Sequence, residues 1–401
     1  MILTEAQEKG LKIAVDRYTA GERYTTIAGY AGTGKSYLVK ALIQCLPGID
    51  PEKDVVYCAL TGKACQVLAK MGNKNISTLH RLLFAYIPLP RGGFKKIPRE
   101  QLDYKIVVVD ECSMVPQEFV DLLLRHRIYI IFLGDPFQLP PIEKDRGNNL
   151  LNYPHIFLTE IIRQEKDNDI IDLSFKIRNG ENIKPQDGKN AKVFRKGDLN
   201  TGMLLWADII LCATNKTRIA LNNQIRNLKG FGEDPENGDK IICLQNNWER
   251  FAIDENNESS FGDPLVNGCI GYLYNPYLSF NPIPKRCYSS INSIPTVVGK
   301  FVSEIGQDYG ILTMDKKQFT SGEETLDWKT KYSLGKGKDK QLIPEQFTYG
   351  YAITTHKSQG SSWPNVLVIE ENFPVEAEEH RRWVYTSLTR ASDKVVFIKK
   401  N

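Results

Sequence analysis

A glycine-rich segment near the N-terminus constrains the fold of this chain more than any other feature. It reads Gly29-Tyr30-Ala31-Gly32-Thr33-Gly34-Lys35-Ser36 and matches the pattern G-x-x-x-x-G-K-[ST]. The β-branched run before it, residues 24–28, predicts a strand, and the apolar residues after it recur at helical spacing. A strand, such a loop and a helix together are typical of a P-loop. Its backbone N–H groups and the N-terminus of its helix attract phosphate. We therefore expect Lys35 to reach the β- and γ-phosphates of a nucleotide and Ser36 to ligate Mg²⁺.

An acidic pair follows the next strongly apolar run. Asp110 and Glu111 end the segment 106–109, whose continuous β-branched character predicts a strand buried on both faces. Beside a P-loop, we expect Asp110 to hold Mg²⁺, directly or through water, and Glu111 to orient or deprotonate the attacking water. The alternative is an ordinary polar strand end.

A third candidate is Gln138, which lies in the segment 134–141 after a further predicted strand. Its amide could sense the γ-phosphate and report it to a nucleic-acid groove. The same residues also fit a tight proline-containing turn. The spacing alone does not choose between the two.

Strand-like and helix-like patterns alternate over the first 150 residues and return near the C-terminus. This alternation predicts an α/β fold with parallel sheets flanked by helices. We expect one α/β unit over residues 1–152 and a second over residues 153–234 and 344–401. Residues 83–104 predict a hairpin insertion with its turn at Gly92 and Gly93. Residues 235–343, rich in Gly, Asn, Pro and Ser, predict a β-rich insertion.

Composition narrows the class of protein. The chain has 52 Lys and Arg against 48 Asp and Glu, a net charge of +4, which permits nucleic-acid binding without requiring it. Its eight cysteines form no C-x-x-C pair, so we expect reduced thiols and no zinc site. Apolar runs stay far below the roughly 20 residues of a membrane span, and no secretory signal is visible. We expect a cytoplasmic protein that does not bind membranes.

The order of these motifs resembles that of the superfamily 1 helicases. Their residues resemble those of the 5′→3′ branch, superfamily 1B. The motifs resemble those of the Dda helicase of T-even phages and of the RecD family, which implies the bacterial cytoplasm and a phage origin. The resemblance implies two RecA-like P-loop motor domains, a small hairpin insertion in the first and an SH3-like insertion in the second. It also implies a DNA-dependent ATPase with ATP and Mg²⁺ as cofactors.

The resemblance implies further nucleotide contacts. Gln7 sits where the family reads adenine, and Arg163, within residues 158–164, sits where an arginine contacts the γ-phosphate. Arg390, within residues 384–391, matches the family's arginine finger. Gln359 and Gly360 end the fifth motif, residues 351–360, which bridges nucleotide and DNA in the family.

The same resemblance implies the residues that touch single-stranded DNA. They are Thr61, Gly62, Lys63, Thr78, His80, Thr214, Asn215, Thr355, His356 and Lys357. His80 and His356 could instead be structural histidines. In the hairpin, Phe94 or Phe84 could form a strand-separating pin, although a plain surface hairpin fits the same residues.

Taken together, the residues and the resemblance predict an ATP-dependent DNA helicase that moves 5′→3′ on single-stranded DNA, as a monomer, in replication, recombination or repair. Its expected partners are single-stranded DNA and forks, with a single-strand-binding protein or replisome component as a further partner. Two alternatives keep the ATPase: a single-strand translocase that strips proteins from DNA or remodels forks, and a DNA-stimulated switch. RNA as the track stays open, because backbone contacts discriminate poorly between the nucleic acids.

Overall fold

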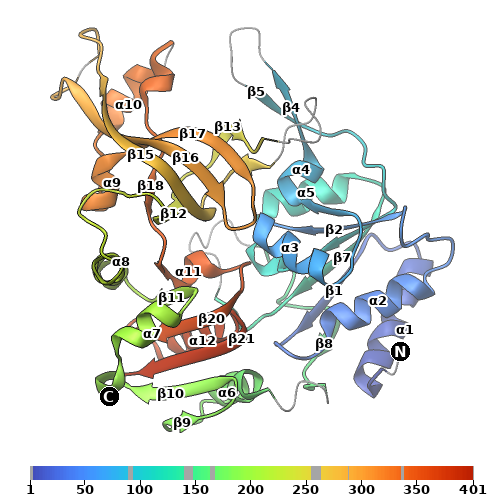
Figure 1. Ribbon diagram of the computed structural model, residues 1–401. Helices are drawn as coiled ribbons and strands as arrows, with labels where there is room; N and C mark the ends of the chain where they lie inside the picture. Colours follow the sequence, from blue (N-terminus) through green and yellow to red (C-terminus); the bar gives the residue numbers. More distant parts are fainter. Residues whose placement is uncertain are drawn as a thin grey trace. The chain divides into compact units, whose positions relative to one another are not determined.

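The computed structural model of the chain describes residues 3–88, 94–139, 148–162, 168–253, 263–287, 289–335 and 338–400. These residues form two compact units, whose parts are coloured along the chain in Figure 1. The first, called the α/β unit below, contains Met1–Thr214 and Thr354–Asn401. The second, called the β-rich unit, contains Asn215–Ile353.

The N-terminal part of the α/β unit is built on a six-stranded parallel sheet in the order β3-β2-β6-β7-β1-β8. This confirms the parallel sheet expected from the alternating patterns. Since the strands run in one direction, the segments after β1, β6 and β7 all leave the sheet at the same edge. The strands are β1 (Tyr24–Gly29), β2 (Val55–Ala59), β3 (Ile76–Thr78), β6 (Ile106–Val109), β7 (Tyr129–Gly134) and β8 (Ile156–Leu158).

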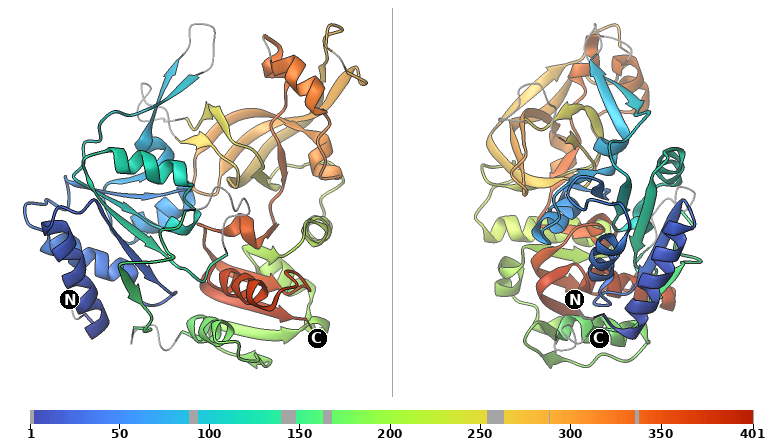
Figure 2. Two further views of the ribbon diagram at one scale, coloured as in Figure 1. Left: turned by 180° about the vertical axis from the view of Figure 1, so that it is seen from behind. Right: turned by 90° about the vertical axis from the view of Figure 1, so that its right-hand side faces the viewer.

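Helices pack on both faces of this sheet (Figure 2). Strand β6 shows why: Ile106 and Val108 lie in one apolar core, and Val107 and Val109 lie in the other. Successive strand residues point to opposite faces, so a continuous apolar run needs cover on both. The helices are α1 (Glu5–Thr19) and α2 (Lys35–Cys45) on the first core, α4 (Leu79–Leu83) and α5 (Gln117–Arg125) on the second, and α3 (Gly62–Lys70) beside β2 and β3.

The remainder of the α/β unit forms a second sheet, in which β11, β20, β21 and β10 follow one another and β9 is antiparallel at the edge beyond β10. Helices α6 and α12 pack against each other and against this sheet. The strands are β9 (Gln186–Asp187), β10 (Ala191–Arg195), β11 (Ile209–Cys212), β20 (Trp363–Ile369) and β21 (Ala391–Lys399). The helices are α6 (Asp169–Arg178), α7 (Thr201–Trp206), α11 (Thr355–Ser358) and α12 (Ala377–Leu388).

The expected hairpin is present as two antiparallel strands, β4 (Phe84–Pro88) and β5 (Phe94–Pro98). Their register pairs Phe84 with Pro98 and Pro88 with Phe94. Gly92 and Gly93, which we expected in the turn, lie outside the described residues.

The β-rich unit contains a five-stranded antiparallel sheet in the order β17-β16-β15-β12-β18. Residues 215–234 and 344–353, which we expected in the second α/β unit, group with this sheet, because β18 pairs with β12. The SH3-like form of the insertion stays a prediction. The strands are β12 (Lys240–Cys243), β13 (Asn247–Phe251), β14 (Pro264–Leu265), β15 (Ile270–Pro282), β16 (Ser293–Ser303), β17 (Asp308–Asp315) and β18 (Phe347–Tyr349), and the helices are α8 (Asn215–Leu228), α9 (Lys316–Thr320) and α10 (Trp328–Gly335).

Through β19 (Ala352–Thr354) the chain passes back into the α/β unit. None of the helices described is both long enough and apolar enough to cross a membrane.

A buried ion pair ties α8 to the β-rich sheet. Arg226 is 3% exposed and Asp239 is 0% exposed, and the guanidinium Nε lies 3.0 Å from Asp239 Oδ1. Arg226 also donates to the carbonyl oxygens of Gly232 and Asp234, both at 2.7 Å, and lies 4.0 Å from the ring centroid of Tyr349. Every charge of the pair is therefore compensated inside the protein.

We predict that Asp239→Asn lowers the free energy of unfolding by about 3–5 kcal/mol, because it leaves the Arg226 guanidinium buried without its counter-charge. Denaturant unfolding followed by circular dichroism measures this. Glu5→Gln is the matched control, since it breaks the exposed Glu5–Lys9 pair and should leave the unfolding midpoint nearly unchanged. Equal effects of the two substitutions would contradict the role of the buried pair.

Candidate functional site

The P-loop spans the end of β1 and the start of α2. Gly32 and Gly34 both have φ of 75°, a left-handed conformation that favours glycine. A Cβ on Gly34 would also lie 2.5 Å from the side-chain nitrogen of Gln7. Gly34 is the N-cap of α2 and has no side chain to occupy the first N–H groups of the helix. The loop can therefore wrap an anion with backbone donors.

Lys35 and Gln7 both contact this loop, Lys35 from the start of α2 and Gln7 from α1. The Lys35 ammonium donates to the carbonyl oxygens of Gly29, at 2.7 Å, and Tyr30, at 3.1 Å. Gln7 is 2% exposed, and its amide nitrogen donates to the carbonyl oxygen of Thr33 at 3.3 Å. The Gln7 amide oxygen accepts from the N–H of Thr4, in the capping box of α1. These contacts make Gln7 a support of the P-loop, and its expected reading of adenine stays a prediction.

Asp110 and Glu111 follow β6 at the same edge of the sheet. Burial, and then the neighbouring Glu111 carboxylate, raise the pKa of Asp110 to about 6. The Glu111 N–H donates to Asp110 Oδ1 at 2.9 Å and opposes this rise. Glu111 has φ of 51°, a left-handed conformation that costs a non-glycine residue about 1–3 kcal/mol. The strained turn places two half-buried carboxylates side by side, and nearby cations would stabilise their charge.

One such cation comes from the far end of the chain. Arg390 follows α12, is 4% exposed, and its Nη1 lies 3.8 Å from Glu111 Oε1. Its Nε donates to the carbonyl oxygen of Thr386 at 3.1 Å, and its Nη1 donates to that of Ser361 at 3.3 Å. The structure thus brings together Glu111 and Arg390, which we expected in one site. Arg163, expected beside them, lies outside the described residues.

The two glutamine candidates are buried nearby. Gln138 is 7% exposed and Gln359 is 6% exposed. The Gln359 amide nitrogen donates to the carbonyl oxygen of Leu139. Among the described residues, no partner is found for the amide oxygen of either glutamine. Both can therefore still accept a hydrogen bond, as from an attacking water.

The candidate metal ligands are oxygen atoms only, the Ser36 hydroxyl and the Asp110 carboxylate, which suits Mg²⁺. Within the described ranges, no cluster of three or more His, Cys, Asp and Glu could hold a metal ion. These residues therefore fit a Mg²⁺ ion that takes its remaining ligands from phosphate and water.

Sequence reasoning missed three residues around the P-loop. The Tyr385 hydroxyl accepts from the Ala31 N–H at 2.9 Å and donates to Asp135 Oδ2 at 2.6 Å. The Arg178 guanidinium carbon lies 3.6 Å from the ring centroid of Tyr30. Asp135 lies in the segment 134–141, which we had singled out for Gln138, and Tyr385 lies in the segment 384–391, which we had singled out for Arg390. Arg178 lies in no motif that we recognised.

In the first half of the α/β unit, the expected DNA contacts lie at helix starts. Thr61 caps α3, where its hydroxyl accepts from the Ala64 N–H at 3.2 Å and donates to the Gly360 carbonyl oxygen at 2.9 Å. Thr78 caps α4 and is 7% exposed. Gly62 and Lys63 open α3. Both threonine hydroxyls accept a hydrogen bond from the helix that they cap, and contact of these helix starts with DNA stays a prediction.

His80 follows in α4, with its ring 4.7 Å from that of Phe119 in an edge-on contact. Burial, and then the nearby Lys96 ammonium, lower the pKa of His80 to about 3. The imidazole is therefore neutral at physiological pH and brings no charge to a phosphate.

The expected contacts of the second half are more varied. Thr214 binds Glu371, to whose Oε1 its hydroxyl donates at 2.8 Å. Asn215 begins α8, in the β-rich unit. Thr355 is 0% exposed and its hydroxyl bonds that of Ser387 at 2.8 Å, so its side chain does not reach a ligand as we expected.

His356 and Lys357 lie in α11, and burial lowers the pKa of His356. The candidate pin residue Phe94 begins β5. Phe84, the other candidate, is 7% exposed, with the Lys96 ammonium 3.7 Å from its ring centroid, so it packs in the core and is wrong as a wedge.

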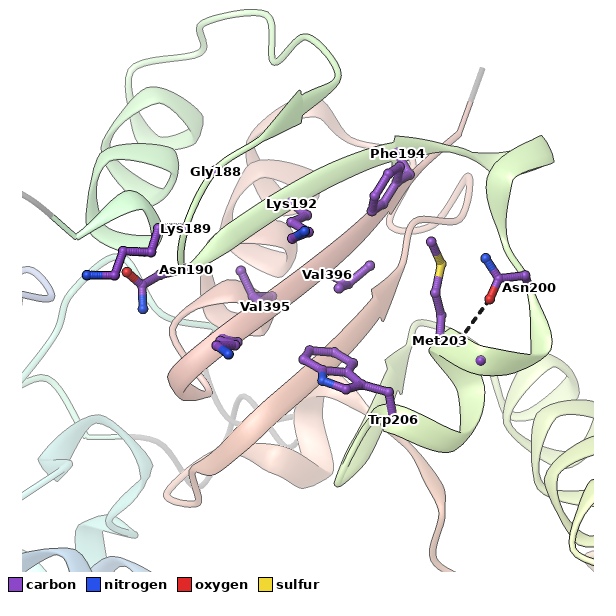
Figure 3. A pocket seen from close by; sticks show the side chains of 12 residues that line it. Gly188, Lys189, Asn190, Lys192, Phe194, Asn200, Met203, Trp206, Val395 and Val396 are labelled. Carbon is purple, nitrogen blue, oxygen red and sulfur yellow. Dashed lines mark hydrogen bonds between the residues drawn. The ribbon is translucent and has the colours of Figure 1, made fainter.

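The α/β unit also has a hollow of about 580 Å³ on its second sheet. Figure 3 shows Phe194 on β10, Val396 on β21, and Met203 and Trp206 on α7 around it. Its lining contains none of the residues that we expected in the nucleotide site.

Comparisons with known proteins agree with this geometry. An AAA domain model matches residues 3–194, and a UvrD-like helicase C-terminal domain model matches residues 349–398. Together they match more than half of the chain. The chain thus contains an AAA domain and a UvrD-like helicase C-terminal domain, and it is similar to superfamily 1B helicases.

Two curated relatives and one solved structure illustrate the similarity. The ATP-dependent RecD2 DNA helicase of Deinococcus radiodurans is 26% identical over 94% of this chain and 47% of its own length. The ATP-dependent DNA helicase dda of Enterobacteria phage T4 is 26% identical over 63% of each protein. The chain thus spans about half to two thirds of these relatives. The Pif1 helicase from Bacteroides, in complex with ADP-AlF3 and ssDNA, shares the fold, with a TM-score of 0.50, 17% identity and coverage of 99% of this chain and 92% of that one.

We predict that His80 makes the protein less stable in acid. In the unfolded chain its imidazole takes up a proton near pH 6.5, whereas in the folded chain it stays neutral down to about 3. The unfolded state therefore binds more protons between these values, and the free energy of unfolding falls as the pH is lowered through 6.5. Denaturant unfolding at pH 7.5 and pH 5 measures the fall, which should be smaller in His80→Gln. An identical fall in both proteins would contradict the assignment.

Proposed function

We propose that this chain is an ATP-dependent DNA helicase that moves 5′→3′ along single-stranded DNA and unwinds duplex. The observation that carries the proposal is the 3.8 Å approach of Arg390 to Glu111, beside the P-loop edge of the first sheet. Phosphoryl transfer needs cations on more than one side of the γ-phosphate, because charge spreads over its oxygens in the transition state. DNA as the track is supported by the relatives, which are named as ATP-dependent DNA helicases.

In this proposal the first sheet supplies the nucleotide site. The P-loop N–H groups and Lys35 hold the phosphates, and Ser36 and Asp110 hold Mg²⁺, which screens phosphate charge when bound. Glu111 orients the attacking water and accepts its proton. Arg390, with Arg163, contacts the γ-phosphate from the other half. Burial raises the pKa of Asp110, and a bound Mg²⁺ would oppose that rise, because a cation stabilises the ionised carboxylate.

We assign the first motor domain to residues 1–152, with the hairpin of residues 83–104, and the second to residues 153–234 and 344–401. Residues 235–343 form the inserted domain. Hydrolysis removes the γ-phosphate that Arg390 contacts. Contact between the two motor domains therefore depends on which nucleotide is bound. If each half holds the DNA backbone through helix N-termini such as that of α3, cyclic closure becomes stepping along the strand. We propose that a monomer suffices for this and that a single-strand-binding protein or replisome component is a further partner.

We predict that the protein unwinds a duplex with a 5′ single-stranded tail and leaves a matched duplex with a 3′ tail intact. Lys35→Ala should abolish both unwinding and ATP hydrolysis, because it removes the cation that the P-loop holds against the phosphates. A fluorescence strand-separation assay with excess trap strand measures the product.

Each other outcome has a defined meaning. Unwinding of the 3′-tailed duplex instead would contradict the proposed direction of movement, but it would still support an ATP-driven motor. DNA-stimulated hydrolysis without unwinding of either substrate would favour a translocase or an ATPase switch. Hydrolysis stimulated only by RNA would contradict the assignment of DNA as the track.

A further inference from the structure

Tyr385 occupies a position that no motif role accounts for. It lies on α12 and is 1% exposed. Its hydroxyl accepts a hydrogen bond from the P-loop N–H of Ala31 and donates one to Asp135, which follows β7. One oxygen atom thus joins the helix of the second half to two segments of the first half.

The hydroxyl is held rigidly. The Tyr385 ring meets that of Phe137 edge-on at 5.2 Å. Asp135 is 2% exposed, and its second oxygen accepts from the Phe137 N–H at 2.9 Å. The donor, the acceptor and the ring between them are therefore fixed by packing as well as by hydrogen bonds.

Further residues of α12 bind the same segment after β7. Arg382 donates to the Pro136 carbonyl oxygen at 3.1 Å, and the Thr386 hydroxyl accepts from the Leu139 N–H at 2.9 Å. Positions 382, 385 and 386 are spaced by three and four residues, so they share one face of the helix. Arg390 is the next turn along from Thr386, to whose carbonyl oxygen its Nε donates. The position of the Arg390 guanidinium thus depends on how this face is held.

We propose that Tyr385 is a positioning residue, whose hydroxyl fixes the arginine-bearing end of α12 against the P-loop and thereby sets the rate of ATP hydrolysis. The inference rests on the proposed ATPase function of the same site. In the described part of the first half, Arg382 and Thr386 bind the segment after β7, whereas Tyr385 binds both that segment and the P-loop. It is therefore the residue of this face that links the position of the phosphate-binding loop directly to that of the arginine.

The test is Tyr385→Phe, which removes one oxygen atom and keeps the ring. We expect kcat of DNA-stimulated ATP hydrolysis to fall by about tenfold. The variant loses the hydrogen bond to the Asp135 carboxylate, and the rate depends on the position of Arg390 that this bond helps to fix. KM for ATP should change by less than threefold, since the phosphate-binding N–H groups and Lys35 remain. Amide hydrogen exchange of the P-loop should become faster.

Tyr129→Phe is the matched control. Tyr129 is 6% exposed, and its hydroxyl bonds the Thr25 hydroxyl at 2.5 Å and the Ala14 carbonyl oxygen at 3.2 Å. It begins β7, at the end of the strand opposite to Asp135. The control loses an equally buried hydroxyl, so it should match Tyr385→Phe in unfolding midpoint but keep the wild-type kcat and P-loop exchange.

The outcomes separate the inference from the proposed function. Wild-type hydrolysis stimulated by DNA supports the function whatever the variants do. A kcat of Tyr385→Phe within twofold of wild type, or an equal fall in both variants, would overturn the positioning role alone. A rise in KM without a fall in kcat would also overturn it, because the hydroxyl would then serve nucleotide binding. Absence of hydrolysis in the wild type would overturn both proposals.

Discussion

The approach of Arg390 to Glu111 is the contact on which the candidate site depends. Two neighbouring carboxylates follow β6, where both residues are half-buried, and loss of hydration raises the pKa of Asp110. Buried charges of one sign are costly unless charges of the other sign accompany them. Lys35 comes from the P-loop and Arg390 from the end of α12, and both oppose the rise in the pKa of Asp110. The same cations are those that a transferred phosphoryl group requires.

The fold explains why residues so distant in sequence meet. Parallel strands place the P-loop, the acidic pair and Asp135 at one edge of the first sheet. Helix α12 then presents one face to that edge, where Arg382 and Tyr385 donate hydrogen bonds and Thr386 accepts one. In the motor that we propose, these contacts would transmit a change at the phosphates to the helix, because they reach both the P-loop and the segment after β7. This is the physical basis for coupling hydrolysis to movement in the proposed motor.

Much of this could be predicted from the sequence, because short-range patterns carried the information. The continuous apolar run at residues 106–109 predicted a strand with cover on both faces, and the structure places alternate residues in two cores. The P-loop could be recognised from its glycines, two of which have the left-handed φ that the loop needs. In contrast, the roles of side chains depended on long-range packing. Thr355 matched a family motif yet is fully buried against Ser387, and Tyr385 gained its contacts only through the docking of α12.

We propose that one ATP site is completed by Arg390, from the second half of the α/β unit. The most direct measurement is the single-turnover rate of ATP hydrolysis by Arg390→Ala, with saturating single-stranded DNA and with nucleotide affinity measured on the same preparation. We expect the rate to fall by about 10³-fold or more and the affinity to change far less, because the arginine acts on charge that develops in the transition state. A folded variant that binds ATP normally and loses less than tenfold in rate would contradict the claim.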